Sequence, residues 1–315
     1  MSFQRIAWTA ALLGLLGMAG STAAAEGAKA FTLVPGEHGM LLKAPDGRTV
    51  FGYMTRKPAQ SKLTANSVCC LFPVNTPSGE RVVDFAPSDH PHHRGVFLAW
   101  HATEGRQPAD FWGWGEWAPT EGRVIKNRSV KLAAADREHA VLEVRNDWVV
   151  GDEVMIEEAT SLAVREEQGA FVVDLDYRLV PRTDVTLKQT AFGGLCAKCR
   201  KGHNAYYSSP QGKVGLPDPH YLKPETDWPS ADWYDYTSEQ AGGKTIGIAV
   251  LDHPGNPPTV WHNLAPIAML NPCIVAPGPV TLEKGQPLRL RYRLVVHDGP
   301  PPQDLLEELS KAWRM

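Results

Sequence analysis

The sequence predicts an all-β fold, a large antiparallel β-sandwich that ends in one short helix. Runs of about 6 to 12 residues rich in β-branched and aromatic side chains recur along the chain. Gly, Pro, Asp or Asn bounds each run, and helical spacing is confined to the C-terminus. No repeat of roughly 20 to 50 residues is visible, which disfavours a propeller and leaves a sandwich or a barrel.

The expected strands divide between alternating segments and short buried runs. Gly95–His101 has apolar residues at both odd and even positions, so it predicts a central strand that is buried on both faces. Arg81–Ala86 is a short run that Pro87 stops. The other expected strands are Thr49–Thr55, His139–Val150, Val154–Val164, Ala170–Val180, Val185–Phe192, Lys244–Leu251 and Leu288–His297.

The C-terminus carries the expected helix, and an irregular stretch precedes the last strands. In Pro302–Trp313 the side chains of Leu305, Leu306 and Leu309 recur at helical spacing, which predicts a helix with one face on the sheet. Asn204–Gln240 is the longest stretch without an expected strand, and it is rich in Tyr, Trp, Pro and Asp. Its aromatic side chains either stack on sugar rings or pack the loop down.

The N-terminus has the pattern of a secretory signal. Arg5 precedes an apolar segment, Ile6–Gly20, and the small residues Ala23–Ala25 follow. This pattern predicts a signal peptide of residues 1–25, which leaves residues 26–315 as one exported domain, periplasmic or extracellular. No later run reaches about 18 apolar residues, so no membrane contact is expected after signal removal.

Composition excludes some classes of partner. The chain has 315 residues and a net charge of −3, and no basic tract or stripe is present, so nucleic acid is not an expected partner. Cys196 and Cys199 with His203 have a zinc-like spacing without a fourth ligand, so a structural disulfide or idle thiols are expected. The five cysteines are Cys69, Cys70, Cys196, Cys199 and Cys273. Nothing in the sequence specifies an oligomeric state.

Four of the eleven histidines lie within twelve positions, in the stretch SDHPHHRGVFLAWHATEG that starts at Ser88. Pro91 favours an extended backbone before it, which would place His90 and His92 on one side and His93 on the other. His101 would lie about 26 Å from His93 along a straight strand, so it is expected at the far end of the sheet or as a space-filling residue.

A second Asp-His-Pro unit echoes the first. Asp252-His253-Pro254 follows an expected strand, as Asp89-His90-Pro91 does, and His262 comes nine residues after His253. If the two strand ends lie side by side, these histidines converge, and Asp89 or Asp252 orients one of the rings. Arg94 would supply a fork of donors for a carboxylate or a sugar hydroxyl.

Two chemistries suit such a cluster. Neutral histidines act as general acid and base near pH 7, with Arg94 stabilising negative charge. Alternatively, His90, His92 and His253 hold a divalent metal with an open position for water. The structural alternative is a histidine network that only joins loops by hydrogen bonds.

Two further patterns carry polar groups among apolar residues. Asp110–Trp117 (DFWGWGEW) interleaves aromatic rings with carboxylates and glycines, which is typical either of a carbohydrate platform or of core aromatics. Glu157 and Glu158 lie in an apolar strand, so one of them faces inward if both sheet faces are covered. A buried carboxylate would have a raised pKa and act as a base, whereas a sheet with one solvent-facing side, which we expect here, removes the need for one.

The ordered set of motifs resembles one bacterial family, whose members are labelled methane oxygenase PmoA-like or domain of unknown function. The resemblance spans Phe31–Gly299. The motifs are SDHPHHRGVFLAWH from Ser88, DFWGWG from Asp110, FGGL from Phe192, GIAVLDHPGNPPTVWH from Gly247 and LRYRLVVHDG from Leu290. The resemblance implies a supersandwich fold similar to galactose mutarotase, and a setting in bacteria that degrade plant and algal polysaccharides.

The positions that match the family are Asp89, His90, His92, His93, Arg94, His101, Asp110, Trp112, Glu158, Asp252, His253, Pro254, Asn256 and His262. We interpret His90, His92, His253, Arg94 and Glu158 as the catalytic candidates. The substrate-binding candidates are His93, His101, Asp110, Trp112, Asn256 and His262, with Trp112 stacking on a sugar ring.

These observations predict an exported carbohydrate-active enzyme that acts on a glycoside, an oxidised sugar or a uronate. Histidine acid–base chemistry would drive epimerisation, elimination or hydrolysis, with no certain cofactor and a divalent metal as the alternative. A non-catalytic glycan-binding sandwich and a metal-dependent oxygenase are the two rival functions. The first would bind sugar without forming product, and the second would hold copper or iron.

Overall fold

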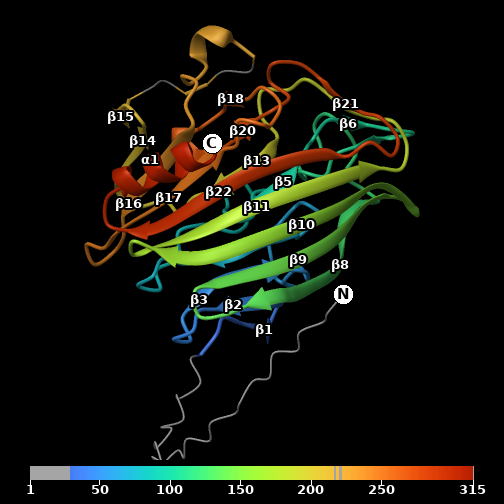
Figure 1. The fold of residues 1–315 in the computed structure, drawn as a ribbon. Helices are drawn as coiled ribbons and strands as arrows, with labels where there is room; N and C mark the ends of the chain where they lie inside the picture. Colours follow the sequence, from blue (N-terminus) through green and yellow to red (C-terminus); the bar gives the residue numbers. More distant parts are fainter. Residues whose placement is uncertain (1–28, 216–217, 220–221, 315) are drawn as a thin grey trace, which may run out of the picture.

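Two large antiparallel sheets form a β-sandwich, the architecture that the sequence predicts (Figure 1). This computed structural model describes residues 29–215, 218–219 and 222–314, so the expected signal peptide lies outside the described residues. The nine-stranded sheet has the order β15 (Gly212–Val214), β14 (His203–Ser209), β16 (Trp233–Glu239), β17 (Thr245–Asp252), β22 (Leu288–Asp298), β11 (Ala170–Pro181), β10 (Glu153–Glu167), β9 (His139–Val150), β8 (Arg123–Ala135).

The seven-stranded sheet packs behind it. Its order is β1 (Thr32–Gly36), β2 (Gly39–Lys43), β3 (Thr49–Met54), β4 (Cys70–Val74), β5 (Val96–Ala99), β13 (Gly194–Lys198), β19 (Met269–Leu270). A four-stranded sheet has the order β21 (Val280–Leu282), β12 (Val185–Leu187), β6 (Thr103–Glu104), β7 (Pro108–Ala109), and β18 (Val260–Trp261) pairs with β20 (Pro272–Cys273). Two 3-10 turns, η1 (Pro224–Thr226) and η2 (Ala265–Ile267), lie in the connections.

Alternation along β11 shows how the core is built. Phe171, Val173 and Leu175 join the large core between the two sheets, whereas Ala170 and Val172 belong to a smaller apolar cluster on the opposite face. Successive side chains of a strand point to opposite faces, so β11 is apolar on both. The nine-stranded sheet is therefore covered on both sides around β11 and β22.

The C-terminal helix covers that second face. Helix α1 (Gln303–Ala312) buries Leu305, Leu306 and Leu309 in the smaller cluster, as their helical spacing predicts (Figure 1). Among the described residues, no helix has the length and apolar character needed to cross a membrane.

Two expectations about elements are wrong. Arg81–Ala86 forms only isolated bridges, because Arg81, Val83 and Phe85 each pair with a different segment and no ladder develops. Asn204–Gln240 is not an irregular stretch, since it contains β14, β15 and β16. The aromatic side chains of this stretch, including buried Tyr207, Trp228 and Tyr236, pack on one another. Buried cross-strand aromatic pairs, rather than turn residues, therefore decide the structure here.

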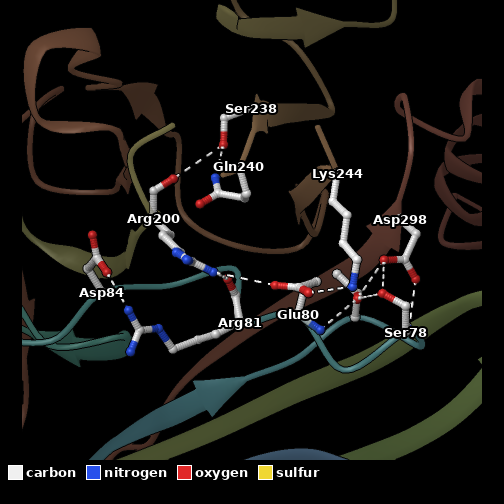
Figure 2. A network of polar contacts seen from close by, with 10 residues as sticks. Ser78, Glu80, Arg81, Asp84, Arg200, Ser238, Gln240, Lys244 and Asp298 are labelled. Atoms are coloured by element: carbon white, nitrogen blue, oxygen red, sulfur yellow. Dashed lines mark hydrogen bonds and ion pairs between the residues drawn. The ribbon is translucent and has the colours of Figure 1, made fainter. Parts of the chain in front are cut away.

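A network of polar contacts lies at one end of the sandwich (Figure 2). The turn after β4 carries Thr76 and Ser78, whose hydroxyls donate to the carboxylate of Asp298 at the end of β22, at 2.7 and 2.6 Å. Lys244, just before β17, donates to Glu80 at 2.6 Å. These contacts join a turn of one sheet to strand ends of the other.

Candidate functional site

Three histidines gather in the turn that precedes β5. The backbone N–H of His93 donates to the carbonyl of His90 at 3.0 Å, so this segment is a tight turn and not the expected extended chain. The ring centroids of His90 and His93 are 5.2 Å apart, and those of His92 and His93 are 4.5 Å apart. The expected separation of His93 from the other two is therefore wrong, because the turn brings all three rings together.

These rings open onto a cavity of about 210 Å³. Its lining residues are His90, His92, His93, Trp114, Phe192, Pro219, His262, Leu264, Ile267 and Met269. Imidazole rings thus form one part of the wall, and aromatic and aliphatic side chains form the rest. The cavity lies where the turn before β5, the segment before β13 and the chain around η2 meet.

The imidazoles of this cavity are neutral near pH 7. Burial, together with the nearby His90 and Arg94, lowers the pKa of His92 to about 4. Burial alone lowers the pKa of His262 to about 4. Burial, followed by the repulsion of neighbouring histidines, also holds the pKa of His93 well below its usual value. Each neutral ring offers one hydrogen-bond donor and one acceptor.

Several polar atoms around the cavity are buried without a partner. Within the described parts of the chain, Nδ1 of His90 and Nδ1 of His93 make no hydrogen bond, and neither does Nε1 of Trp112. Most buried polar groups in folded proteins are hydrogen-bonded, so a cluster of unpaired ones calls for an explanation. Because these nitrogens are themselves buried, a ligand in the cavity would meet the histidine rings through other ring atoms.

His101 lies behind the cavity wall, not at the far end of the sheet. Its ring stacks on Phe192, with the ring centroids 4.4 Å apart, and packs against Trp114, with the centroids 5.6 Å apart. Burial lowers its pKa to about 3, and among the described residues neither of its ring nitrogens has a hydrogen-bond partner. The chain turns after β5, which is why a straight-strand distance gave the wrong position.

Arg94 does not reach the cavity as a ligand-binding fork. Its guanidinium is fully buried, donates to the carbonyls of Trp112 at 2.9 Å and Phe111 at 3.1 Å, and lies 4.2 Å from the ring centroid of Phe97. It therefore joins the histidine turn to the segment after β7. The expected contact with an oxyanion or carboxylate is not what this geometry provides.

Asp110 and Trp112 also have roles other than the expected direct contacts with a sugar. The Asp110 carboxylate accepts the N–H of Gly113 at 2.7 Å and that of Gly115 at 2.5 Å, which shapes the loop. Trp112 is fully buried, with its ring 5.6 Å from His93 and 4.7 Å from Phe97, so a sugar cannot stack on it. The sequence missed Trp114, which does line the cavity.

The second Asp-His-Pro unit does not join the cluster. His253 accepts the N–H of Gly255 at 2.8 Å on Nδ1, and its ring packs 4.9 Å from Trp313 near the C-terminus. Asn256 stabilises the same turn, because its amide donates to Asp252 at 2.7 Å and to the carbonyl of Arg291 at 2.8 Å. This unit follows β17 of the nine-stranded sheet, whereas His90–His93 precede β5 of the other sheet. The expected convergence is therefore wrong for His253, but it is found for His262, which lines the cavity with His90 and His92.

Strand β10 has a solvent-facing side, as expected, but this side does not remove the need for a buried carboxylate, because Glu158 faces the core between the sheets. Its carboxylate accepts hydrogen bonds from Asn146 at 2.8 Å, Trp148 at 2.7 Å and Thr160 at 2.8 Å. Burial raises the pKa of Glu158, and these hydrogen bonds oppose the rise. Its neighbour Glu157 points outward and pairs with Arg182. The raised pKa matches the expectation, but Glu158 is not among the residues that line the histidine cavity.

No preformed metal centre is found in the described residues, where no group of three or more His, Cys, Asp and Glu side chains could hold an ion. His253 lies apart from His90 and His92, so the three histidines of the alternative metal site are not assembled. All five cysteines are buried and free, in agreement with idle thiols and not with a disulfide between Cys196 and Cys199.

The sequence also missed a buried lysine beside the cavity. Lys198 on β13 donates from Nζ to the carbonyl of Ile267, a lining residue, and it lies close enough to lower the pKa of His90 and His93. Burial lowers the pKa of Lys198 itself. A charged residue in the otherwise apolar run GGLCAK was the only signal of this position.

Comparisons with known proteins give one family match. Residues 43–311 match the profile described as Family of unknown function (DUF6807). A search of the curated proteins found no match. The match carries no methane-oxygenase label, so that part of the resemblance stays an expectation.

Solved structures show a distant likeness. A galactose mutarotase related enzyme from Lactobacillus acidophilus has 8% identity and a TM-score of 0.38, over 85% of this chain and 97% of that one. A GalM/aldose epimerase homologue from C. elegans has 10% identity and a TM-score of 0.35, over 85% and 98% of the two chains. The GH36 alpha-galactosidase AgaA from Geobacillus stearothermophilus has 9% identity and a TM-score of 0.40, over 86% of this chain and 40% of that one.

Proposed function

This chain belongs to the DUF6807 family, and we propose that it is a carbohydrate-active enzyme whose histidine cavity binds one neutral sugar ring. The histidines would transfer protons to and from that ring. The reaction would be an epimerisation, an elimination or a hydrolysis, since all three need a positioned base and acid.

One observation carries the proposal: neutral imidazoles share a single cavity with an aromatic and aliphatic wall. A sugar ring presents hydroxyl groups at its edge, each of which donates and accepts hydrogen bonds, and C–H groups on its faces. Neutral His90, His92 and His262 match the hydroxyls because each has one donor and one acceptor. Trp114 and Phe192 match the C–H faces.

The size and charge of the cavity narrow the ligand further. A volume of about 210 Å³ equals the liquid volume of about seven water molecules, which suits one sugar ring and not an oligosaccharide. The described lining residues include no charged side chain. The guanidinium of nearby Arg94 donates its hydrogen bonds to backbone carbonyls and does not reach the cavity. A neutral ring is therefore favoured over a uronate.

His90 and His92 are the best placed pair for proton transfer. Both line the cavity, and their ring centroids are 5.7 Å apart. Nδ1 of His90 lies 3.8 Å from the Asp89 carboxylate, which opposes part of the fall in its pKa. With a pKa below its usual value, His90 is neutral and can act as a base at neutral pH. His92 would hold the tautomer whose N–H donates a hydrogen bond to the sugar.

The same pKa values favour one rival. His92, with a pKa of about 4, is a weak base near pH 7, which suits hydrogen bonding to a sugar better than proton abstraction. A non-catalytic glycan-binding protein is therefore the second candidate. It differs from the first in forming no product from any sugar that it binds.

Export is part of the proposal, since the N-terminal pattern of residues 1–25 is that of a secretory signal. A polysaccharide fragment would then meet the protein outside the cytoplasm. N-terminal sequencing of the protein from a fractionated host tests this point. A mature chain that begins at Glu26 is expected, and an intact Met1 in the cytoplasm would contradict it.

The activity is tested by a product screen of residues 26–315 with plant and algal glycosides, 3-keto sugars and uronates. Chromatography must precede mass spectrometry, because epimers have equal mass. His92→Ala tests the cavity, and His139→Ala, an exposed histidine on β9, is the matched control. A product that is formed by the wild type and the control but not by His92→Ala supports the enzyme. Sugar binding without product supports the glycan-binding rival, and neither binding nor product rejects both.

A further inference from the structure

The loop Asp110–Trp117, here called the aromatic loop, carries an aromatic side chain that the cavity does not use. Trp114 lines the cavity, whereas Trp117 is 54% exposed. Only Leu222 shares such exposure among the large hydrophobic side chains of the described residues. A single exposed hydrophobic side chain is normal on a protein surface, so it is the position of Trp117 relative to the cavity that indicates a role.

The aromatic loop is rigid before any ligand arrives. The buried carboxylate of Asp110 accepts two backbone N–H groups of the loop, from Gly113 and Gly115. Gly113 has a φ of 102°, and a Cβ atom there would lie 2.3 Å from Ala65, so only glycine fits. A surface held in this way loses little conformational entropy when a ligand binds.

Trp117 is connected to the cavity wall by ring contacts. The ring of His101 lies 5.8 Å from Trp117, 5.6 Å from Trp114 and 4.4 Å from Phe192. Phe192 and Trp114 both face the cavity. His101 is itself buried, so it joins the two tryptophans beneath the surface: one ring contacts both the cavity-lining Trp114 and the exposed Trp117, which places Trp117 beside the cavity wall.

We propose that Trp117 is an outer stacking site for the second sugar ring of the substrate. The substrate would then be a glycoside of at least two rings, with one ring in the cavity and the next on Trp117. This inference rests on the proposed sugar-binding function and names the substrate class more closely. The cavity holds a single ring, so a longer substrate must extend past its mouth.

The second ring is expected to be uncharged. Glu116, the neighbour of Trp117, is exposed, and its carboxylate would repel an acidic ring. A neutral pyranose stacks its C–H face on the indole and keeps its hydroxyls in water.

Isothermal titration with matched pairs of sugars tests the proposal. The probes are the methyl glycosides of glucose, galactose, mannose and xylose, each beside α- and β-linked disaccharides of the same sugar. The wild type is expected to bind one disaccharide about tenfold more tightly than its methyl glycoside. Trp117→Ala should remove that preference without weakening the methyl glycoside, and Trp117→Phe should retain most of it.

The outcomes separate this inference from the proposed function. His92→Ala should weaken both sugars of a pair, whereas His139→Ala, the control on β9, should weaken neither. If Trp117→Ala leaves the disaccharide preference unchanged, or if the wild type has none, the outer site is wrong while the histidine cavity stands. If the wild type binds none of these sugars, the proposed function fails, and the outer site fails with it.

Discussion

The histidine cavity and the polar network at the end of the sandwich treat polar groups in opposite ways. In the network the carboxylates of Glu80, Asp84 and Asp298 each face a donor from a neighbouring side chain (Figure 2). Beside the cavity, Nδ1 of His93 makes no hydrogen bond to any described residue, and Nδ1 of His90 has only the Asp89 carboxylate, 3.8 Å away. Both regions are rich in polar residues, so composition alone does not distinguish them.

The difference teaches where stability and function lie in this molecule. A satisfied network contributes to folding, because each paired group recovers the interactions that it loses with water. Buried imidazoles without partners oppose folding. Changes in the cavity are therefore expected to alter ligand binding, and changes in the network to alter stability in denaturant.

The largest expected effect is the loss of activity in His92→Ala. Removal of a general acid or base lowers turnover by about 10²- to 10⁴-fold. Because the ring of His92 makes no hydrogen bond to any residue that the structure describes, the free energy of unfolding should change by less than about 1 kcal/mol. Turnover on the substrate from the product screen, beside urea unfolding, checks both parts. A large loss of stability would mean that the cavity is structural, like the network.

Arg94→Met should destabilise the fold more than any change in the network. The guanidinium supplies hydrogen bonds to the carbonyls of His92, Phe111 and Trp112, and methionine would leave these without a donor. Each unsatisfied buried acceptor costs about 1 to 3 kcal/mol, so a loss of about 3 to 5 kcal/mol is expected in urea unfolding. Arg178→Met, at an exposed position of β11, is the matched control and should change little. Equal stability of the two variants would show that the carbonyls find other partners.

Lowering the pH should unfold the protein partly through the cavity. His92 and His262 have pKa values of about 4 in the folded chain and about 6.5 when unfolded, so the unfolded state binds protons first as the pH falls. The contribution of each neutral ring is complete above pH 6.5 and declines towards pH 4, by at most about 3 kcal/mol. His262→Gln should therefore lose less stability than the wild type between pH 7 and pH 4.5. Parallel pH profiles of the two proteins would show that His262 is not held neutral by burial.

Sequence reasoning reached the sheets more readily than the site. β9, β10, β11, β17 and β22 were predicted because each is a run rich in β-branched and aromatic side chains between turn-forming residues, and β9 also alternates. The histidine turn was found from its crowding, but its shape depends on a hydrogen bond between His93 and His90 that no local pattern reveals. The role of Arg94 was not predictable either, because its acceptors are carbonyls from a segment 17 and 18 residues away.

The echo of Asp-His-Pro misled for a related reason. A motif specifies a local turn, such as the one in which the Asn256 amide donates to the carbonyl of Arg291. It does not specify the sheet to which its strand belongs. Topology placed β5 and β17 in different sheets, so His253 and His90 are separated. Trp117 carried no signal beyond its residue type, since exposure is a property of the folded chain.

The smallest expected effect is in the network itself, from Asp298→Asn. Burial alone would raise the pKa of Asp298, but the hydrogen bonds from Ser78 and Thr76 outweigh it and hold the pKa below its usual value. The ionised carboxylate thus stabilises the fold above the unfolded pKa of about 4, and this contribution disappears as the pH falls through the lower folded value. Asp298 is largely exposed, so solvent screening limits the loss to about 1 kcal/mol or less. Urea unfolding of Asp298→Asn at pH 7 and pH 3 measures it, and the difference from the wild type should be smaller at pH 3. A loss of stability that is independent of pH would mean that the amide disrupts the turn by its shape. The charge of Asp298 would then contribute nothing, as in the cavity, whose histidines are neutral.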